Sequence, residues 1–261
     1  ITINQPDPNE FGNNQWIANV YDGSNFDNYN GRFTLNTTSI DLANALGNDL
    51  NSPQSINGYS GCDPGTDYWS VSFKRTNWDC GQYDFHLAAW DDNVQIRFDY
   101  DGDGTWDDTS TNYTCCSTTG DVHWYPVLNA NSKVEVRFSE ATGNALLQLN
   151  ISKTNNPPLA GTPAGDEMLC PDQQPSAITV SGEQAFGTVS YQWQSSTDGS
   201  TWQDISGATA ASYTPAQLSQ TTYFRRGITD ACNNTSYTSA VIKTVKSEPV
   251  GENLQLMTCS N

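Results

Sequence analysis

Hydrophobic and polar residues alternate over several short stretches of the chain, and this alternation predicts β-strands. The clearest alternations cover residues 69–74, 83–87, 94–98, 134–138 and 147–151. In each of them every second side chain is apolar, so one face of the strand can be buried while the other stays polar. The pattern therefore predicts a two-sided β fold that ends near Ser152.

One segment has the features of a short helix instead. Residues 39–48 (SIDLANALGN) begin with Ser39, a preferred N-terminal cap, carry Asp41 in the first turn and reach Gly47 at the C-terminal end. We therefore expect one short helix in an otherwise β-rich domain.

A change in composition near residue 154 predicts a domain boundary. Residues 154–165 (TNNPPLAGTPAG) are rich in proline and glycine, as linkers are. Short strands then follow at the density of a second β-sandwich, at 178–180, 189–193, 223–228 and 241–245. We expect an all-β chain with one domain over 1–153, a second over 154–246 and a linker into a following module over 247–261.

The charge of the chain narrows the range of its partners. Its 261 residues include 29 Asp and Glu against 11 Lys and Arg, a formal net charge of −18. This field repels phosphate backbones and anionic lipid headgroups and attracts cations, so we expect no nucleic-acid partner. No apolar run approaches the roughly twenty residues that cross a bilayer, so we expect no membrane insertion.

The composition also indicates an oxidising compartment. The chain is low in lysine and rich in asparagine, serine, threonine and glycine, and its seven cysteines include no C-x-x-C pair. This combination is typical of secreted β-rich proteins with disulfides, not of cytosolic metal sites. No basic and apolar leader begins at Ile1, and we interpret the sequence as a window from a longer secreted chain.

The cysteines divide between the two domains. The disulfide candidates of the first domain are Cys62, Cys80, Cys115 and Cys116. Because a bond between the adjacent Cys115 and Cys116 needs strained geometry, we expect each of them to pair with one of the other two. In the second domain we expect Cys170 to pair with Cys232, which leaves Cys259 for a partner in the next module.

Four aspartates follow the strand at 94–98 with the spacing D-x-D-x-D-G-x-x-D. They are Asp99, Asp101, Asp103 and Asp107. The spacing suits Ca²⁺, but Ser110 stands where a helix–loop–helix calcium loop needs a bidentate glutamate, and the flanks alternate as strands. We therefore predict a β-hairpin loop that binds Ca²⁺ through the four carboxylates. The alternative is a plain Asp-Gly hairpin turn without an ion.

The adjacent acids Asp91 and Asp92 are a less specific motif, since such a pair is commonly a solvated strand end. Two carboxylates on adjacent residues of one strand cannot flank a glycosidic bond, because hydrolysis requires the two carboxyl groups to be roughly 5 Å or more apart. No G-x-S-x-G elbow or catalytic triad pattern is present either, so we expect no enzyme.

Trp90 is a candidate platform for sugar stacking or a core residue. We interpret His86 and His123 as separate surface histidines rather than zinc ligands.

Much of the first domain resembles a known family. The stretches that carry the resemblance are DYWSVSFKR (67–75), GQYDFHLAAWDD (81–92), VQIRFDYDGDG (94–104) and VEVRFSEATGNALLQLNIS (134–152). They are similar to the protective-antigen-type, lectin-like β domain of yeast flocculins and epithelial adhesins. In that family two adjacent aspartates joined by a cis peptide hold a Ca²⁺ that contacts sugar hydroxyls. The resemblance implies these roles for Asp91 and Asp92, with Asn144 in the loop 139–145 as a further ligand.

The second domain resembles another family. The stretch SYQWQSSTDGSTWQDISGATAASYTPAQLSQTTYFRRGITDAC (190–232) is similar to the immunoglobulin-like repeats of very long bacterial adhesins, including gliding-motility adhesins, that the type nine secretion system exports. The resemblance implies that Trp193 is the core tryptophan and that Tyr223 lies near the start of the penultimate strand.

These observations lead to one functional expectation and two alternatives. We expect a non-enzymatic segment of a large secreted adhesin on a bacterial cell surface. Its first domain would bind surface glycans or polysaccharide through Ca²⁺, and its second would be a spacer between neighbouring modules of the same chain. The first alternative is a structural stalk that calcium and disulfides stiffen, without glycan binding. The second is an accessory region of a secreted glycoside hydrolase.

Overall fold

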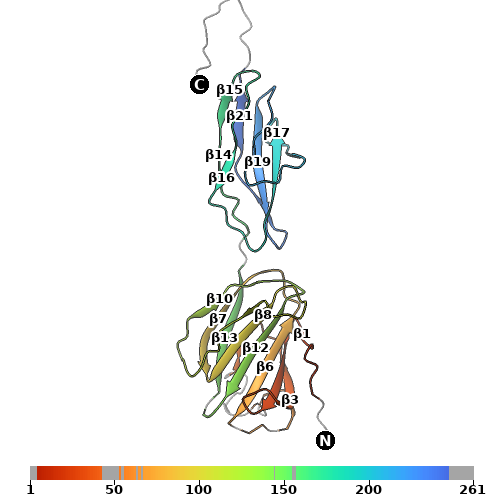
Figure 1. Cartoon of the computed structure of the whole chain (residues 1–261), viewed down its shortest axis with the longest axis vertical. Helices are drawn as coiled ribbons and strands as arrows, with labels where there is room; N and C mark the ends of the chain where they lie inside the picture. Colours follow the sequence, from red (N-terminus) through yellow and green to blue (C-terminus); the bar gives the residue numbers. More distant parts are fainter. Residues whose placement is uncertain are drawn as a thin grey trace, which may run out of the picture. The chain divides into compact units, whose positions relative to one another are not determined.

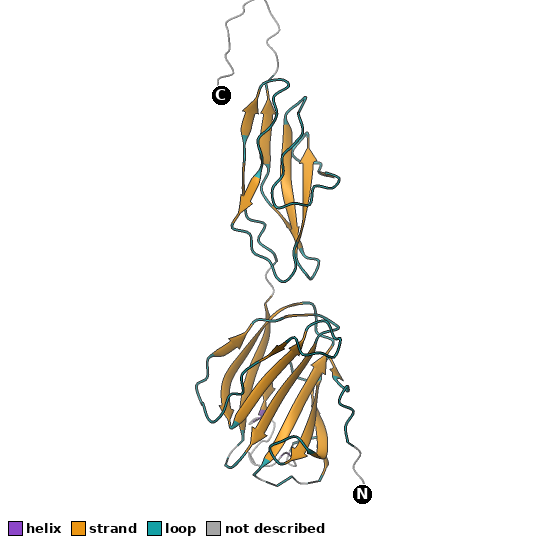
Figure 2. Ribbon diagram, viewed as in Figure 1, coloured by secondary structure: helices purple, strands orange, loops and turns teal. Residues whose placement is uncertain are grey.

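The computed structural model describes residues 5–42, 53, 56–62, 64–65, 67–143, 145–154 and 157–246. The chain divides into two compact units, Ile1–Asn155 and Asn156–Asn261, close to the boundary expected after residue 153. Both units are built from β-strands, which confirms the predicted all-β class (Figure 1 and Figure 2). The linker expected over 247–261 lies outside the described residues.

The first unit is a sandwich of two sheets (Figure 1). The larger sheet has the order β5 (Ser60–Gly61), β3 (Asn28–Leu35), β2 (Trp16–Asp22), β6 (Trp69–Thr76), β12 (Lys133–Glu140), β8 (Asn93–Asp99) and β9 (Asp108–Thr109), with β1 (Gly12–Asn13) parallel to β6. The smaller sheet has the order β10 (Val122–Trp124), β7 (Gly81–Asp91), β13 (Leu146–Thr154) and β4 (Ile40–Asp41), with β11 (Val127–Leu128) beside β7. The alternating stretches of the sequence lie in β6, β7, β8, β12 and β13, which confirms them as strands.

The core of this unit is formed by the apolar positions of the alternation. Phe73, Ile96 and Val136 point inward from the larger sheet, and Phe85 and Leu149 do so from the smaller one; all five are fully buried. On the other faces of the same strands the side chains are polar, as in sandwiches generally. Because β7 and β8 belong to different sheets, the turn between them crosses from one layer to the other.

The prediction of a helix over 39–48 is wrong about where the helix begins. Ile40 and Asp41 form strand β4, paired with Leu149 and Gln148 of β13. The hydroxyl of Ser39 accepts a hydrogen bond from the Ile151 amide at 2.8 Å, so it is used by the sheet and does not cap a helix. Burial of Ile40 against the core outweighs the local capping signal. Residues from 43 onward in this segment lie outside the described residues.

The second unit is a smaller β-sandwich. One sheet has the order β15 (Glu167–Leu169), β21 (Val241–Val245), β19 (Thr222–Thr229), β17 (Ser190–Ser196) and β18 (Gln203–Asp204), with β20 (Thr235–Tyr237) beside β19. The other pairs β14 (Thr162–Ala164) with β16 (Thr179–Ser181). Trp193 is fully buried in the core with Ile178 and Phe224, and its indole N–H donates to the Ala210 carbonyl at 2.8 Å. The prediction of Trp193 as a core residue is confirmed.

This unit also buries two basic side chains against carboxylates. Lys243 is fully buried, and its Nζ lies 2.7 Å from Glu167 Oε2, which also accepts hydrogen bonds from Ser176. Arg226 is paired with Glu183 and donates to the Ala211 carbonyl. A buried charge is tolerated only when it is paired and hydrogen-bonded, so these contacts are needed by the fold.

We expect Glu167→Gln to lower the free energy of unfolding of the second unit by about 3–5 kcal/mol, because the buried Lys243 ammonium loses its carboxylate. The hydrogen bond from Lys243 lowers the pKa of Glu167. The ionised carboxylate therefore contributes stability above its unfolded pKa of about 4.3, and this contribution is lost as the pH falls through the lower folded pKa. Urea unfolding at several pH values, followed by hydrogen exchange of β19 and β21, measures both effects.

The matched control is Asp204→Asn, which makes the same charge change at an exposed position of the same unit. Exposed substitutions of this kind usually change stability by no more than about 0.5 kcal/mol. If the two variants unfold alike, the Glu167–Lys243 pair is not a stabilising contact.

Candidate functional site

Asp91 and Asp92 lie at the turn that joins the two sheets of the first unit. Asp91 is the last residue of β7, and β8 begins one residue after Asp92. The Asp91–Asp92 peptide bond is cis, as the family resemblance predicted. One carboxylate oxygen of each residue lies within 4.8 Å of the other. Burial, and then the charge of Asp92, raises the pKa of Asp91, so the two carboxylates interact directly.

The segment after β12 is held against this pair. Asp92 Oδ2 accepts a hydrogen bond from the Ala141 amide at 2.6 Å, and the Asn93 amide group donates to Ser139 Oγ at 3.2 Å. Further along, the Gly143 amide donates to Asp67 Oδ1 at 3.3 Å. Residues 139–143 of the predicted loop therefore lie beside the aspartates, while Asn144, its predicted ligand, lies outside the described residues.

Glu140 is a third carboxylate at this place, and we did not expect it from the sequence. Its side chain is fully buried, and among the residues that the structure describes neither of its oxygens has a hydrogen-bond partner. Burial raises the pKa of Glu140 to about 7, with further contributions from Asp92, Asp91 and Asp67. A signal existed in the sequence, because Glu140 continues the inward-facing alternation of β12. We call Asp91, Asp92 and Glu140 the acidic cluster.

The acidic cluster fits a hard divalent cation. Burial and the charge of Asp92 raise the pKa of Asp91, and burial with the charges of Asp92 and Asp91 raises the pKa of Glu140, so the ionised forms of these carboxyls are destabilised unless an opposite charge is present. A buried carboxylate without hydrogen bonds is costly in the same way. Ca²⁺ prefers oxygen ligands of this kind, and it accepts about six to eight of them. Asp91 and Asp92, whose oxygens lie within 4.8 Å of each other, are therefore the residues that could hold calcium, and Glu140 is a further buried carboxylate whose charge interacts with theirs.

A disulfide between adjacent cysteines covers one side of Asp91. Cys115 and Cys116 are bonded to each other, and their sulfur atoms lie 3.7 and 2.7 Å from Asp91 Oδ1. Both cysteines are exposed. The segment that carries them is attached at both ends by β-bridges, Val94 with Tyr113 and Trp90 with Ser117. The disulfide is therefore held next to the acidic cluster.

This bond corrects the predicted cysteine pairing. Cys115 and Cys116 do not bond to Cys62 or Cys80, and Cys62 is an exposed free thiol. The reason is topological: Cys62 follows β5 at one edge of the larger sheet, whereas the bridged segment lies against β7 and β8 near the other edge. Cys80, Cys170 and Cys232 are disulfide-bonded, and the pairing of Cys170 with Cys232 stays a prediction.

Trp90 is half-buried beneath the same segment. Its ring lies 5.7 Å from that of Tyr113, and a side chain added at Gly120 would meet it at 2.4 Å. Its indole nitrogen is buried and has no partner among the described residues. These contacts are those of a residue at the rim of the core, and its predicted role as a sugar platform stays a prediction.

The hairpin loop between β8 and β9 brings together three of its four aspartates. Oxygens of Asp99, Asp101 and Asp107 lie within 4.8 Å of one another, while Asp103 Oδ1 accepts the Thr105 amide at 2.7 Å. Asp99 is buried, and its two oxygens accept hydrogen bonds from the amides of Gly102 and Gly104 at 2.6 and 2.9 Å. The Lys133 ammonium lies 3.4 Å from Asp99 Oδ2. The Gly102 and Gly104 amides and Lys133 thus supply partners for the buried Asp99 carboxylate without an ion. The calcium site of this loop stays a prediction.

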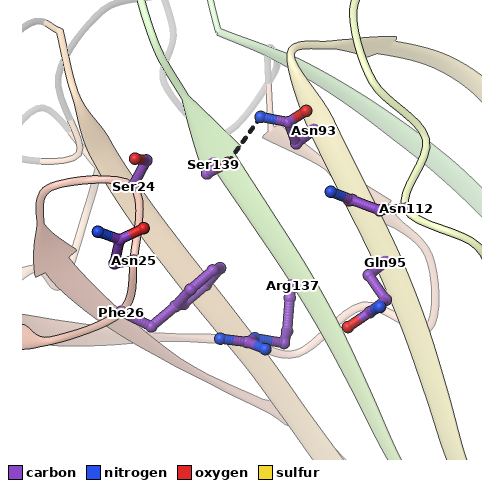
Figure 3. Close-up of a pocket in the computed structure, with 8 residues that line it drawn as sticks. All are labelled: Ser24, Asn25, Phe26, Asn93, Gln95, Asn112, Arg137 and Ser139. Carbon is purple, nitrogen blue, oxygen red and sulfur yellow. Dashed lines mark hydrogen bonds between the residues drawn. The ribbon is translucent and has the colours of Figure 1, made fainter.

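A polar pocket of about 380 Å³ lies on the outer face of the larger sheet, over β8 and β12, whereas the Glu140 side chain points inward from β12. Figure 3 shows the residues that line it: Ser24, Asn25, Phe26, Asn93, Gln95, Asn112, Arg137 and Ser139. Asn93 and Ser139 directly neighbour Asp92 and Glu140 in the sequence. The Arg137 guanidinium lies 3.9 Å from the centre of the Phe26 ring. Amides, hydroxyls, a guanidinium and one aromatic ring can together bind the hydroxyls and the apolar face of a sugar.

The second unit matches a family. Residues 159–247 match the family described as Domain of unknown function (DUF8696). No curated protein is similar in sequence to the chain. Among the described residues no helix has the length and hydrophobicity needed to cross a membrane.

Several solved structures are distantly similar to the chain. One is the A domain of a subtype-switched Epithelial Adhesin 9 from Candida glabrata in complex with β-lactose, with 8% identity and a TM-score of 0.39, covering 54% of this chain and 81% of that chain. A β-1,2-glucanase from Parabacteroides distasonis has 16% identity and a TM-score of 0.25, covering 69% of this chain and 31% of that chain. An anti-sigma factor domain-containing protein from Clostridium clariflavum has 11% identity and a TM-score of 0.34, covering 88% of this chain and 99% of that chain. TM-scores this low carry no argument about function.

Proposed function

We propose that the first unit is a calcium-dependent carbohydrate-binding domain of the adhesin type. The observation that carries the proposal is the acidic cluster, where the buried Glu140 has no hydrogen-bond partner among the described residues. A divalent cation at this place would offset most of the negative charge of the three carboxylates. Ca²⁺ has more ligand positions than three carboxylates fill, so vicinal hydroxyls of a sugar can take the remainder.

The polar pocket on β8 and β12, the strands that follow Asp92 and end at Glu140, supports a sugar as the ligand. The polar pocket offers neutral amides and hydroxyls from Asn25, Asn93, Gln95 and Ser139, which bind hydroxyl groups without requiring a charged ligand. The exposed Cys115–Cys116 disulfide adds a compact surface of low polarity beside Asp91. A site of this composition holds a saccharide at the surface, and we propose no catalytic step for it.

The remaining parts of the proposal concern the setting of this domain. We propose a secreted protein of a bacterial surface, in which the second unit is an immunoglobulin-like spacer, and export by the type nine secretion system stays a prediction. The disulfides at Cys80, Cys170 and Cys232 support an oxidising compartment.

A glycan array probed with the whole chain tests the proposal. We expect binding to a limited set of glycans in millimolar Ca²⁺ and its loss in EDTA, with recovery when Ca²⁺ is restored. If Ca²⁺ raises the melting temperature but no glycan or polysaccharide binds, the structural stalk becomes the better interpretation. Hydrolysis of a bound polysaccharide during the same incubation would contradict the non-enzymatic function.

A further inference from the structure

Two histidines that are distant in the sequence face each other on the outer side of the smaller sheet. His86 of β7 and His123 of β10 are direct cross-strand partners. Their rings are stacked, with centroids 4.2 Å apart and an angle of 5° between the planes. The Tyr125 ring is also stacked with that of His123, with centroids 5.8 Å apart. From the sequence we expected two separate surface histidines, but the pairing of β10 with β7 brings them together.

Carboxylate oxygens lie next to ring nitrogens of both histidines. His123 Nε2 lies 3.1 Å from Asp121 Oδ1, and His86 Nε2 lies 3.7 Å from the same oxygen. His123 Nδ1 lies 2.7 Å from Asp84 Oδ1, and the carbonyl of Gly120 lies 3.3 Å from His86 Nε2. Both Nε2 atoms are thus grouped around one carboxylate oxygen.

We propose that His86, His123 and Asp121 form a binding site for a divalent transition-metal ion of the Zn²⁺ class. One ligand atom from each of the three residues lies within 4.8 Å of the other two. Two imidazole nitrogens and a carboxylate oxygen suit Zn²⁺, with a fourth position left for water. The same donors are poor ligands for Ca²⁺, which prefers an all-oxygen shell, so this site is chemically distinct from the acidic cluster.

The contact with Asp84 orients His123 for this role. When Nδ1–H donates to the Asp84 carboxylate, the lone pair of the neutral ring is on Nε2, which faces Asp121. Histidines that bind metals commonly make such a hydrogen bond through the other ring nitrogen. Asp84 therefore acts as a positioning residue.

The geometry requires only small movements to bind the ion. Zn²⁺ binds histidine nitrogen at about 2.0–2.1 Å, so the two parallel rings must tilt toward each other about χ2, a torsion with a broad minimum. The Asp121 side chain is 89% exposed and can follow the ion. Because His86 and His123 are anchored on paired strands, their separation is set by the sheet.

Zinc titration of the whole chain in the presence of millimolar Ca²⁺ tests the proposal. Thiols are first blocked with iodoacetamide, because the free Cys62 thiol is itself a zinc ligand. Competition with a chromogenic chelator then gives the stoichiometry and the dissociation constant. We expect one Zn²⁺ per chain and a shift of the ring carbon resonances of His86 and His123 on binding.

Four variants make the test specific. His86→Gln, His123→Gln and Asp121→Asn should each weaken binding by at least about tenfold, and Asp84→Asn by about ten- to a hundredfold with the histidine ligands intact. Asp108→Asn, an exposed aspartate of β9, is the matched control and should bind as the unchanged chain does. Asp121 is so exposed that its variant keeps the fold. The proposal is overturned if all variants bind Zn²⁺ alike, or if no zinc binds at micromolar concentration.

Discussion

Replacing both Asp91 and Asp92 by asparagine should abolish calcium-dependent glycan binding and leave the first unit folded. The two carboxylates supply charge and ligands for the proposed Ca²⁺, and asparagine keeps their size while removing the charge. Loss of an outer partner of a metal site costs about 10–100-fold in metal affinity, so loss of two direct ligands should cost at least as much. Calcium titration by calorimetry and the glycan array measure the two effects.

The matched control changes two exposed acids of the hairpin loop. Asp101→Asn with Asp107→Asn removes the same charge from the same unit, and both side chains are exposed. We expect this variant to keep glycan binding. It also tests the calcium prediction for the hairpin, since loss of one calcium equivalent here would support that site. Glycan binding that survives the change at Asp91 and Asp92 would contradict the proposed function.

The second large effect concerns Glu140. In EDTA at about pH 8, Glu140→Gln should stabilise the first unit, because it removes a buried negative charge beside Asp92 and Asp91. In saturating Ca²⁺ the same change should destabilise the unit relative to the unchanged chain, because it removes a negative charge that attracts the ion. Bound Ca²⁺ adds about 2.7 kcal/mol of stability at a hundredfold excess over its dissociation constant. Thermal melts of both proteins in the two buffers measure this reversal of sign.

The pH dependence gives an independent check. Burial raises the folded pKa of Glu140 to about 7, above the value of about 4.3 in an unfolded chain. Without Ca²⁺, its contribution therefore reduces stability progressively as the pH rises from the lower to the higher value. The gain from Glu140→Gln in EDTA should be small at about pH 4 and grow toward pH 8. A gain that does not depend on pH, or that is equal with and without Ca²⁺, would contradict a cation-binding role for Glu140.

Several features of the fold could be predicted because they depend on local sequence. The alternation of apolar residues sets which face of each strand is buried, and it correctly marked β6, β7, β8, β12 and β13. The same alternation carries Glu140 inward, although a glutamate is not expected in a core. The start of the helix expected at Ser39 was wrong because capping signals are weak compared with the burial of Ile40 in a strand.

The candidate sites depend on contacts between distant segments. Glu140 lies close to Asp91 and Asp92 because β12 pairs with β8, which follows the turn from β7. The prediction of separate cysteine partners failed because β-bridges at Tyr113 and Ser117 hold the cysteine segment on β7 and β8. The spacing of residues along the sequence does not indicate which distant strands pair.

By itself the sequence determined the all-β class, the two-unit division and, through a family resemblance, the cis Asp91–Asp92 peptide. These features depend on neighbours along the chain or on a short motif. The tertiary structure alone decided the third carboxylate, the adjacent disulfide and the His86–His123 pair. Their physical reason is shared: a binding site needs several ligand atoms within a few ångströms, and only strand pairing brings residues from β7, β10 and β12 that close.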